Sequence, residues 1–477
     1  MSNKFYITTA IPYVNANPHI GFALELVQTD AVARWHRQQG DEVFFLTGAD
    51  ENSLKNVQAA EKEGISTREL VDKNTQRFID LTNTLNISND DFIRTVSDKH
   101  FAGAQKLWST CKPEDIYKKT YKGLYCVGCE QFYTEKELID GKCPEHQKEP
   151  EVVEEENYFF KLSNYQSKLE KLIESDEYRV VPESRKNEVL SFVRMGLEDF
   201  SISRSQARAK NWGVPVPGDE SQVMYVWFDA LSNYITALGY DQTGEEFKKF
   251  WPADVHVIGK GIIRFHAVYW PAMLMSAGVE LPKNLFVHGY INIDGGKMSK
   301  SLGNVIDPFV LVEKYGVEPV RYYLLRYVHP VLDSDFSTKQ FEQAYTADLA
   351  NGLGNLVNRV AGLIEQNDIV IKLDKDRDAN DEFDQLMAGF LFDQALKYIW
   401  DKIAQVDGLI SETKPWELAK TSQTEKLTEI LNQAANSVYH ISWLLKPFLP
   451  ETAEKIEQIF TAEKIIKGTP LFPRLES

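Results

Sequence analysis

Phe5-Tyr6-Ile7-Thr8-Thr9-Ala10 and, further on, Pro18-His19-Ile20-Gly21 are the stretches that decide the fold. The first consists of apolar and β-favouring residues, which predicts a buried strand that ends before the next proline. From His19 to Gln39 apolar residues recur at helical spacing, and Gly40 stands where helices commonly end. Glu42 to Leu46 is strand-like again. A strand, a helix and a strand in this order predict a βαβ unit, and therefore an α/β domain with a parallel sheet of the Rossmann type.

Two short motifs predict a phosphate site. His19 and Gly21 stand at the start of the helix, where amide N–H groups and the helix dipole favour anions. Far along the chain, the glycine-flanked stretch Gly295 to Asn304 contains Lys297-Met298-Ser299-Lys300-Ser301. Its lysines present two charges to a polyphosphate, and its serines add hydroxyl donors. We expect both motifs to hold one nucleotide, through His19, Gly21, Lys297, Ser299 and Lys300.

The pattern along the chain predicts several segments. Between Lys118 and Val216, cysteines, short strands and Lys/Glu-rich helices interrupt the α/β pattern. Strands are expected again at Met224–Phe228, Val255–Ile258 and Leu285–His288, and the chain beyond Thr338 is almost entirely helical by pattern. We expect two halves of a Rossmann nucleotide-binding domain (1–117 and 218–328), an insertion (118–217), a linker (329–350) and an all-α domain (351–477).

The insertion carries a predicted zinc site. Cys126 and Cys129 form a C-x2-C pair, and Cys143 and His146 form a C-x2-H pair after thirteen intervening residues. Three thiolates and one imidazole give a closed tetrahedral shell for Zn²⁺, which leaves no position for a reacting water. We expect one structural zinc ion per chain. The remaining cysteine, Cys111, is expected to be a thiol in the core.

Composition excludes several classes of protein. The 477 residues are 43% hydrophobic and 26% charged, which is ordinary for a globular protein of several domains. No apolar run is long enough to span a bilayer, and the N-terminus lacks a signal-peptide pattern, so we expect a cytoplasmic protein. A net charge of −17 disfavours non-specific binding of nucleic acid. A shape-reading RNA partner would need a local basic strip, and the candidates are Lys118-Lys119, Arg204 with Arg208 and Lys210, or Arg321 with Arg326. Taken singly, each of these is more typical of a solvated face.

The motifs together resemble the paired signature of class I aminoacyl-tRNA synthetases. Three further stretches, Ala10–Asn15, Tyr225–Tyr234 and Gly259–His266, are similar to the methionyl-tRNA synthetase family, and the resemblance covers nearly the whole chain. It implies an enzyme that uses ATP with Mg²⁺ to form methionyl-adenylate and charges initiator and elongator tRNA(Met). It also implies a zinc knuckle in the insertion and an anticodon-binding role for the helical domain. No dimerising C-terminal domain of the kind some family members carry follows, so we expect a monomer.

The resemblance also assigns residues to roles. His19, Lys297 and Lys300 would be catalytic, and Asp50 would pair with the ammonium group of methionine. The pocket for methionine would be lined by Ile11, Tyr13, Trp227, Ala230, Tyr234, Ile262 and His266. Asn355, Arg359 and Trp416 would read the anticodon.

Four positions depart from the family pattern. The first motif normally ends in a second histidine, where this chain has Phe22; Asn52-Ser53 stands in place of His-Gly, and Gly261 in place of an aspartate. Two alternatives therefore stay open: a catalytically weakened paralogue that binds tRNA, and another class I synthetase. The insertion is too small for the editing domain that isoleucine, valine and leucine enzymes need, and a closed zinc shell does not suit a cysteine enzyme. A small-molecule nucleotidyltransferase would leave the helical C-terminal third unexplained.

Overall fold

The computed structural model describes residues 3–128, 131–133, 135–144, 147–241, 244–293, 296–297, 305–374 and 380–475. The chain divides into two compact units. The first, called the sheet unit, consists of Met1–Pro18, Gly40–Asn83 and Ile87–His288. The second, called the helical unit, consists of His19–Gln39, Thr84–Asn86 and Gly289–Ser477.

Six parallel strands form the centre of the sheet unit. In spatial order they are β3 (Asp91–Arg94), β2 (Glu42–Ala49), β1 (Lys4–Thr9), β12 (Val255–Gly259), β13 (Asn284–His288) and β7 (Arg179–Val181). Ile7 of β1 pairs with Phe45 of β2 and with Val255 of β12. The predicted parallel sheet is therefore confirmed. Continuous apolar runs such as Phe5-Tyr6-Ile7 suit it, because both faces of a parallel sheet are usually covered.

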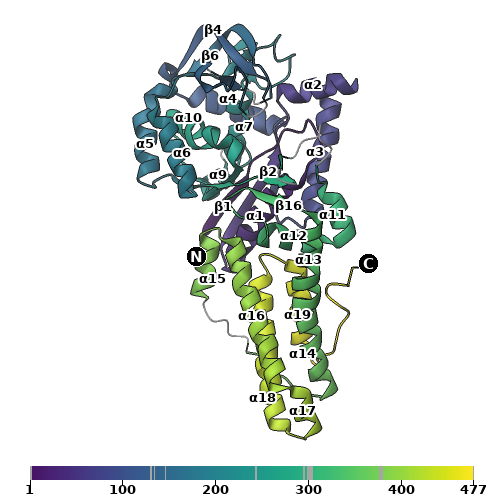
Figure 1. Cartoon of the computed structure of the whole chain (residues 1–477). Helices are drawn as coiled ribbons and strands as arrows, with labels where there is room; N and C mark the ends of the chain where they lie inside the picture. The colour runs from purple at the N-terminus through teal and green to yellow at the C-terminus, as the bar shows by residue number, and fades with distance from the viewer. Residues whose placement is uncertain are drawn as a thin grey trace. The chain divides into compact units, whose positions relative to one another are not determined.

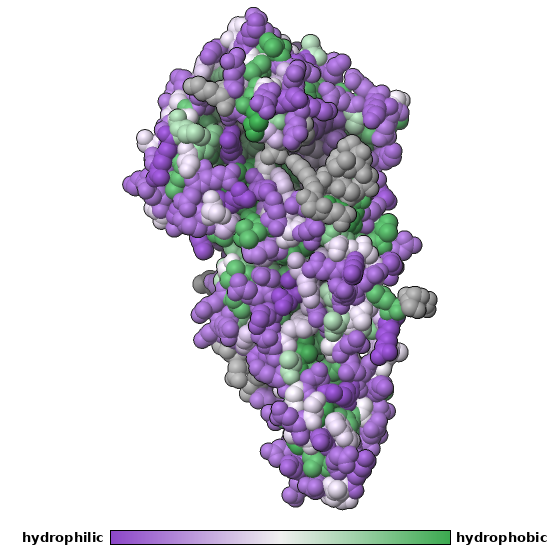
Figure 2. All heavy atoms as spheres, in the orientation of Figure 1, coloured by the Kyte–Doolittle hydropathy of each residue, from purple (hydrophilic) through white to green (hydrophobic). Residues whose placement is uncertain are grey.

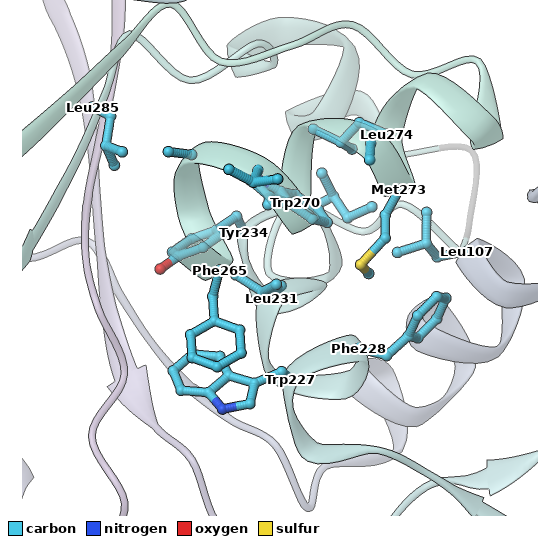
Figure 3. Packing of buried hydrophobic residues seen from close by; sticks show 14 of the residues in the cluster. Leu107, Trp227, Phe228, Leu231, Tyr234, Phe265, Trp270, Met273, Leu274 and Leu285 are labelled. Carbon is cyan, nitrogen blue, oxygen red and sulfur yellow. The ribbon is translucent and has the colours of Figure 1, made fainter. Parts of the chain in front are cut away.

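Short and medium helices complete the sheet unit (Figure 1). They are α2 (Leu54–Glu63), α3 (Thr67–Thr84), α4 (Asp98–Thr110), α5 (Gln166–Glu174), α6 (Glu183–Arg194), α7 (Val226–Leu231), α8 (Asn233–Thr236), α9 (Glu245–Phe250) and α10 (Trp270–Ala277). A π-helical turn, η5 (Phe265–Tyr269), leads into α10. The side chains of α7, α8, η5 and α10 form a continuous apolar core with those of α4 and β13, part of which is shown in Figure 3.

The expected strand at Met224–Phe228 is wrong beyond its first residue. Strand β11 (Asp219–Met224) ends at Met224, and α7 begins at Val226. All six residues of α7 are buried, so the segment has no polar face to reveal a helical period. A short apolar run of this kind does not distinguish a buried helix from a buried strand.

The insertion contributes a separate sheet and also one strand of the central sheet. Strands β5 (Gln131–Tyr133), β4 (Ile116–Cys126), β6 (Glu151–Phe160) and β8 (Phe200–Ser201) form a four-stranded antiparallel sheet in this order. A small sheet of β10 (Pro215–Val216), β11 and β9 (Ser203–Ser205) follows. Strand β7 lies in the same predicted insertion, yet it pairs in parallel with β13 at the edge of the central sheet.

The helical unit is built mainly from long helices. After α1 (Ile20–Gln38), its elements are β14 (Ile291–Ile293), β15 (Gly296–Lys297), α11 (Pro308–Tyr315), α12 (Val317–Arg326), β16 (Ser334–Phe336), α13 (Thr338–Ala344), the π-helical η7 (Tyr345–Gly354), α14 (Asn355–Gln366), α15 (Asp381–Ala388), α16 (Phe392–Thr413), α17 (Pro415–Lys420), α18 (Thr424–Leu445) and α19 (Pro450–Thr461). Helices α14, α16, α18 and α19 run alongside one another in Figure 1. The helical C-terminal region was predicted from its amphipathic pattern.

Arg321, which the sequence placed on a basic strip, is fully buried. Its guanidinium pairs with Asp30 of α1 at 2.7 Å and donates to the carbonyls of Leu85, Pro447 and Phe448. The planar group supplies five donors, so one arginine can join several segments in this way. Arg321 therefore holds the helical unit together and is not available to RNA.

Hydrophilic side chains dominate the face of the molecule shown in Figure 2. In the part of the chain that the structure describes, none of the helices combines the length and the apolar character that crossing a bilayer requires.

Candidate active site

His19 caps the start of α1. Its extended backbone precedes the first helical turn, and its Nδ1 accepts a hydrogen bond from the amide of Gly21 at 3.1 Å. A neutral imidazole that accepts at Nδ1 carries its proton on Nε2, so Nε2 is the nitrogen that would donate to a phosphate oxygen. The ring of Phe22 lies against the imidazole, with centroids 4.4 Å apart. Phe22 thus packs on His19 where a second donor was expected.

Ile306, just beyond the lysine–serine stretch in sequence, lies beside the histidine motif. The amide of Ile20 donates to the carbonyl of Ile306 at 3.1 Å, and Ile306 follows Ser301 by five positions. At the beginning of the stretch, Lys297 lies on β15, and its backbone pairs with Asn292 of β14. Ser299, Lys300 and the side chain of Lys297 lie outside the described residues. The first amides of α1 already have partners, so the imidazole and the helix dipole, rather than those amides, would meet an anion.

An aromatic site in the sheet unit gathers most of the residues assigned to methionine. Trp227 of α7 stacks on Phe265 with centroids 3.8 Å apart and an angle of 7° between the rings (Figure 3). The rings of Tyr13 and His266 lie edge-to-face with that of Trp227, with ring centroids 6.2 Å and 6.3 Å away, respectively. Ala230 lies on the same helix and is buried. Ile11 and Ile262 are partly buried against the same core. Among the described residues, Trp227 Nε1 is buried without a hydrogen-bond acceptor.

His266 is held as a neutral ring. Its Nδ1 lies 3.0 Å from the carbonyl of Ile262, which can only accept, so Nδ1 carries the proton. Its Nε2 then accepts from the hydroxyl of Tyr234 at 2.7 Å. Burial lowers the pKa of His266 to about 4, because the charged form loses its hydration. At neutral pH this side of the site therefore carries no charge.

Asp50 lies next to Tyr13 at the end of β2. The backbones of the two residues pair, with the amide of Asp50 donating to Pro12 at 2.8 Å. Asp50 is only 2% exposed, and its carboxylate accepts from the amide of Asn52 at 3.2 Å. The ammonium of Lys55 lies 4.4 Å from the centre of the Tyr13 ring. The structure thus brings a buried carboxylate to the edge of the aromatic site.

Cys126 and Cys143 share a small cluster of their own in the insertion. Both thiols are buried, together with Tyr133 and against Leu138. The chain turns tightly after Cys143, whose carbonyl accepts from Gln147 and whose amide donates to Lys148. Cys129 and His146 lie outside the described residues, and the described residues alone contain no group of three metal-binding side chains. Cys111 lies in the main core, where burial raises its pKa to about 12.

Three residues of the helical unit were assigned to the anticodon. Asn355 begins α14 and is exposed, and Arg359 follows one turn later. Arg359 forms an ion pair with Asp407 of α16. Trp416 lies in the first turn of α17, and its side chain is 39% exposed, which is unusual for an indole.

Sequence reasoning missed the position of Arg204. It is buried between the rings of Tyr125, Phe132 and Tyr225 and uses only Nη1 in hydrogen bonds, to Ser201 and Ser203. Among the described residues, none accepts from its Nε or Nη2. Arg204 is therefore not part of an exposed basic strip. The alternation of Ser and Arg in β9 gave no signal of this burial.

A parallel sheet whose first strand leads to a helix capped by a histidine, together with the lysine–serine motif in the sequence, is the pattern of a class I aminoacyl-tRNA synthetase. The family model described as "tRNA synthetases class I (M)" matches residues 5–149 and 136–361. The chain belongs to this family, whose members are methionine–tRNA ligases.

Several curated proteins are similar to nearly the whole of this chain. The methionine–tRNA ligase of Clostridium acetobutylicum is 43% identical over 99% of this chain and 78% of its own length. That of Brucella suis is 46% identical over 96% of this chain and 91% of its own. The structure of the Mycobacterium tuberculosis methionyl-tRNA synthetase in complex with methionyl-adenylate superposes with a TM-score of 0.93 and is 39% identical in sequence. The match covers 99% of this chain and 100% of that structure's chain.

Proposed function

We propose that this chain activates methionine with ATP and transfers the methionyl group to tRNA(Met). The carboxylate of methionine attacks the α-phosphorus of ATP, and pyrophosphate leaves. The terminal ribose hydroxyl of the tRNA then takes the methionyl group from the adenylate. The observation that carries the proposal is the aromatic site around Trp227 in a member of this family. A thioether is polarisable and packs well on aromatic rings.

Charge complementarity supports the same assignment. The end of the site that would hold the methionine side chain is neutral, because His266 is uncharged and its Nε2 accepts a hydrogen bond from the Tyr234 hydroxyl. Asp50 supplies the negative charge that an amino-acid ammonium requires, in a buried place where such a contact is strong. The site therefore suits an apolar side chain attached to an ammonium group.

The phosphates of ATP would be held by the helical unit. His19 Nε2 would donate to them, and Gly21 would allow close approach of the adenosine. Lys297 and Lys300, with the Ser299 hydroxyl, would stabilise charge on the departing pyrophosphate, and Mg²⁺ would accompany the nucleotide. The protein contributes positioning and charge, with no covalent intermediate on its own side chains.

Methionine-dependent ATP–pyrophosphate exchange tests this proposal. Exchange is expected with methionine, and much less with leucine, isoleucine, valine or cysteine. Aminoacylation of initiator and elongator tRNA(Met) should follow. Exchange that depends on a different amino acid would assign another class I specificity. Binding of tRNA without exchange by any amino acid would identify a silent paralogue.

We further propose that Cys126, Cys129, Cys143 and His146 hold a structural zinc ion in the insertion (118–217). Two buried thiols in a cluster separate from the main core, beside a tight turn, suit a zinc knuckle. Zinc would take no part in the reaction, since four protein ligands complete its shell. It would fix the loops at the end of the β4–β6 sheet.

Replacing Cys143 with serine is expected to abolish zinc binding. Metal analysis of the purified protein should fall from one zinc per chain to near zero, because a three-ligand remnant binds zinc far more weakly. The matched control is Cys111→Ala, which removes an equally buried thiol from the main core and should keep its zinc. Loss of zinc in the control, or full zinc in Cys143→Ser, would contradict the assignment.

The helical domain (351–477), beyond a linker at 329–350, is proposed to bind the anticodon through Asn355, Arg359 and Trp416. Exposed loop bases stack on aromatic rings and bond through their edges. Trp416 offers an exposed indole for stacking. Asn355 offers an exposed amide at the start of α14, and Arg359 lies one turn along the same helix.

Replacing Trp416 with alanine is expected to lower kcat/KM for tRNA(Met) aminoacylation by roughly 5- to 150-fold, because one stacked base is worth about 1–3 kcal/mol. Pyrophosphate exchange without tRNA should keep the wild-type rate. Val370→Ala, at another exposed apolar side chain of the helical unit, is the control and should change neither rate. An equal loss in both reactions would mean that Trp416 supports the fold and not the anticodon.

A further inference from the structure

A hydrogen-bonded network of buried polar side chains lies beside the aromatic site. Nδ2 of Asn52 donates to Asp229 Oδ2 at 2.8 Å and to the carbonyl of Thr95 at 2.9 Å. Nε2 of His100 lies 2.5 Å from the other oxygen of Asp229, and its Nδ1 lies 2.9 Å from the hydroxyl of Thr236. Asp229 and His100 are fully buried, and Asn52 is 7% exposed. Both carboxylate oxygens of Asp229 therefore receive a hydrogen bond.

Two neighbouring members of this hydrogen-bonded network, Asn52 and Asp229, belong to different walls of the methionine site. Asn52 follows Asp50 by two positions, and its amide donates to the Asp50 carboxylate at 3.2 Å. Asp229 lies in α7 between Trp227 and Ala230. The Asn52 side chain thus links the segment that would hold the ammonium group to the helix that would hold the thioether. The Asn52 side chain also bonds to the carbonyl of Thr95, the residue that follows β3.

We propose that Asn52, acting through Asp229 and His100, is a positioning residue that sets the spacing between the ammonium end and the side-chain end of the amino-acid site. The inference rests on the proposed function, because it concerns the same site. A buried carboxylate needs donors on its oxygens, and without them α7 would lose its fixed place relative to Asp50. What this position must supply is a donor toward Asp229, and the side-chain amide of Asn52 supplies it.

Ser53, the neighbouring departure from the family pattern, has a local role of its own. It is the N-cap of α2, and its hydroxyl accepts from the amide of Asn56. The side-chain Nδ2 of Asn56 donates to the Asp50 carbonyl at 3.1 Å. The Asn52-Ser53 pair is therefore integrated into the structure around Asp50, so these two substitutions do not indicate a damaged site.

The test is the substitution Asn52→Asp, which keeps the size of the side chain and replaces the donor with a negative charge facing Asp229. The KM for methionine in pyrophosphate exchange should rise roughly ten- to a hundredfold, since a hydrogen bond to a charged group is lost. The KM for ATP should stay unchanged. Preference for methionine over its S-ethyl homologue, ethionine, should fall, because the length of the site is no longer fixed. Asn52→His, which restores a donor, should recover both quantities.

The control is Asn157→Asp, at an asparagine of β6 that is 1% exposed and does not belong to the aromatic site. It should leave the KM for methionine and the preference over ethionine unchanged, even if it lowers the melting temperature. Should Asn52→Asp not fold, a double-mutant cycle of Asn52→Ala with Asp229→Asn gives the same answer, and additive effects on the methionine KM would refute the link.

Two results would overturn the inference. One is an unchanged methionine KM and ethionine preference in Asn52→Asp. The other is a parallel loss for methionine and ATP that Asn52→His does not recover, which would mark a general defect in folding. Either leaves the proposed function intact if the wild-type protein exchanges pyrophosphate with methionine. Absence of exchange in the wild type would instead contradict the proposed function itself.

Discussion

Replacing Lys300 with alanine is expected to lower the maximal rate of methionine-dependent pyrophosphate exchange by roughly 100- to 1,000-fold. A fixed charge aimed at oxygens that become more negative in the transition state commonly contributes this much. The reaction offers the protein little covalent chemistry, so positioning and charge carry most of the acceleration. Methionine alone should bind the variant as it binds the wild type, because the aromatic site belongs to the sheet unit and Lys300 does not.

The two effects are separated by measuring exchange and binding on the same preparation. The fluorescence of the tryptophans, which include Trp227, reports methionine binding without ATP. Lys339→Ala is the matched control, because this lysine is exposed on α13 and outside both motifs. It should leave exchange unchanged. A wild-type maximal rate in Lys300→Ala would refute the catalytic role.

The central sheet could be predicted because its signals are local. Strand β1, helix α1 and strand β2 begin within one residue of the positions expected from apolar runs and from Gly40. Helix α7 was missed for the opposite reason, since every residue of it is buried and no periodicity remains. Strand β7 was not predicted as part of the central sheet. Its three residues lie inside an insertion, and their sequence does not indicate that they pair with β13, about a hundred residues away.

The burial of charged side chains, inside and outside the site, could not be predicted from the sequence. Arginine is mostly found on surfaces, so Arg204 and Arg321 were read as basic strips. Their burial depends on partners far apart in the chain, three aromatic rings for Arg204 and Asp30 for Arg321. The same holds for Asp229, whose partner Asn52 lies 177 residues away. One local signal existed, a carboxylate inside the otherwise apolar run of α7, and such a residue is rarely buried without a paired donor.

Replacing Asp50 with asparagine is expected to lower kcat/KM for methionine by roughly 30-fold to several thousandfold. The amide keeps the size of the side chain but removes the charge opposite the substrate ammonium, and loss of one partner of a buried charge pair costs about 2–5 kcal/mol. Asp50 is 2% exposed, so water cannot replace it at low cost. The KM for ATP should stay near its wild-type value.

Ligand analogues show whether the ammonium group is the partner of Asp50. L-Methioninol keeps the ammonium and lacks the carboxylate, and its binding should weaken in Asp50→Asn as much as that of methionine. 4-(Methylthio)butanoate lacks the ammonium, and its weak binding should not weaken further. Asp98→Asn, at an exposed aspartate at the start of α4, serves as the control and should alter neither. If both analogues lose affinity equally, Asp50 shapes the site without contacting the ammonium, and the charge argument for methionine fails.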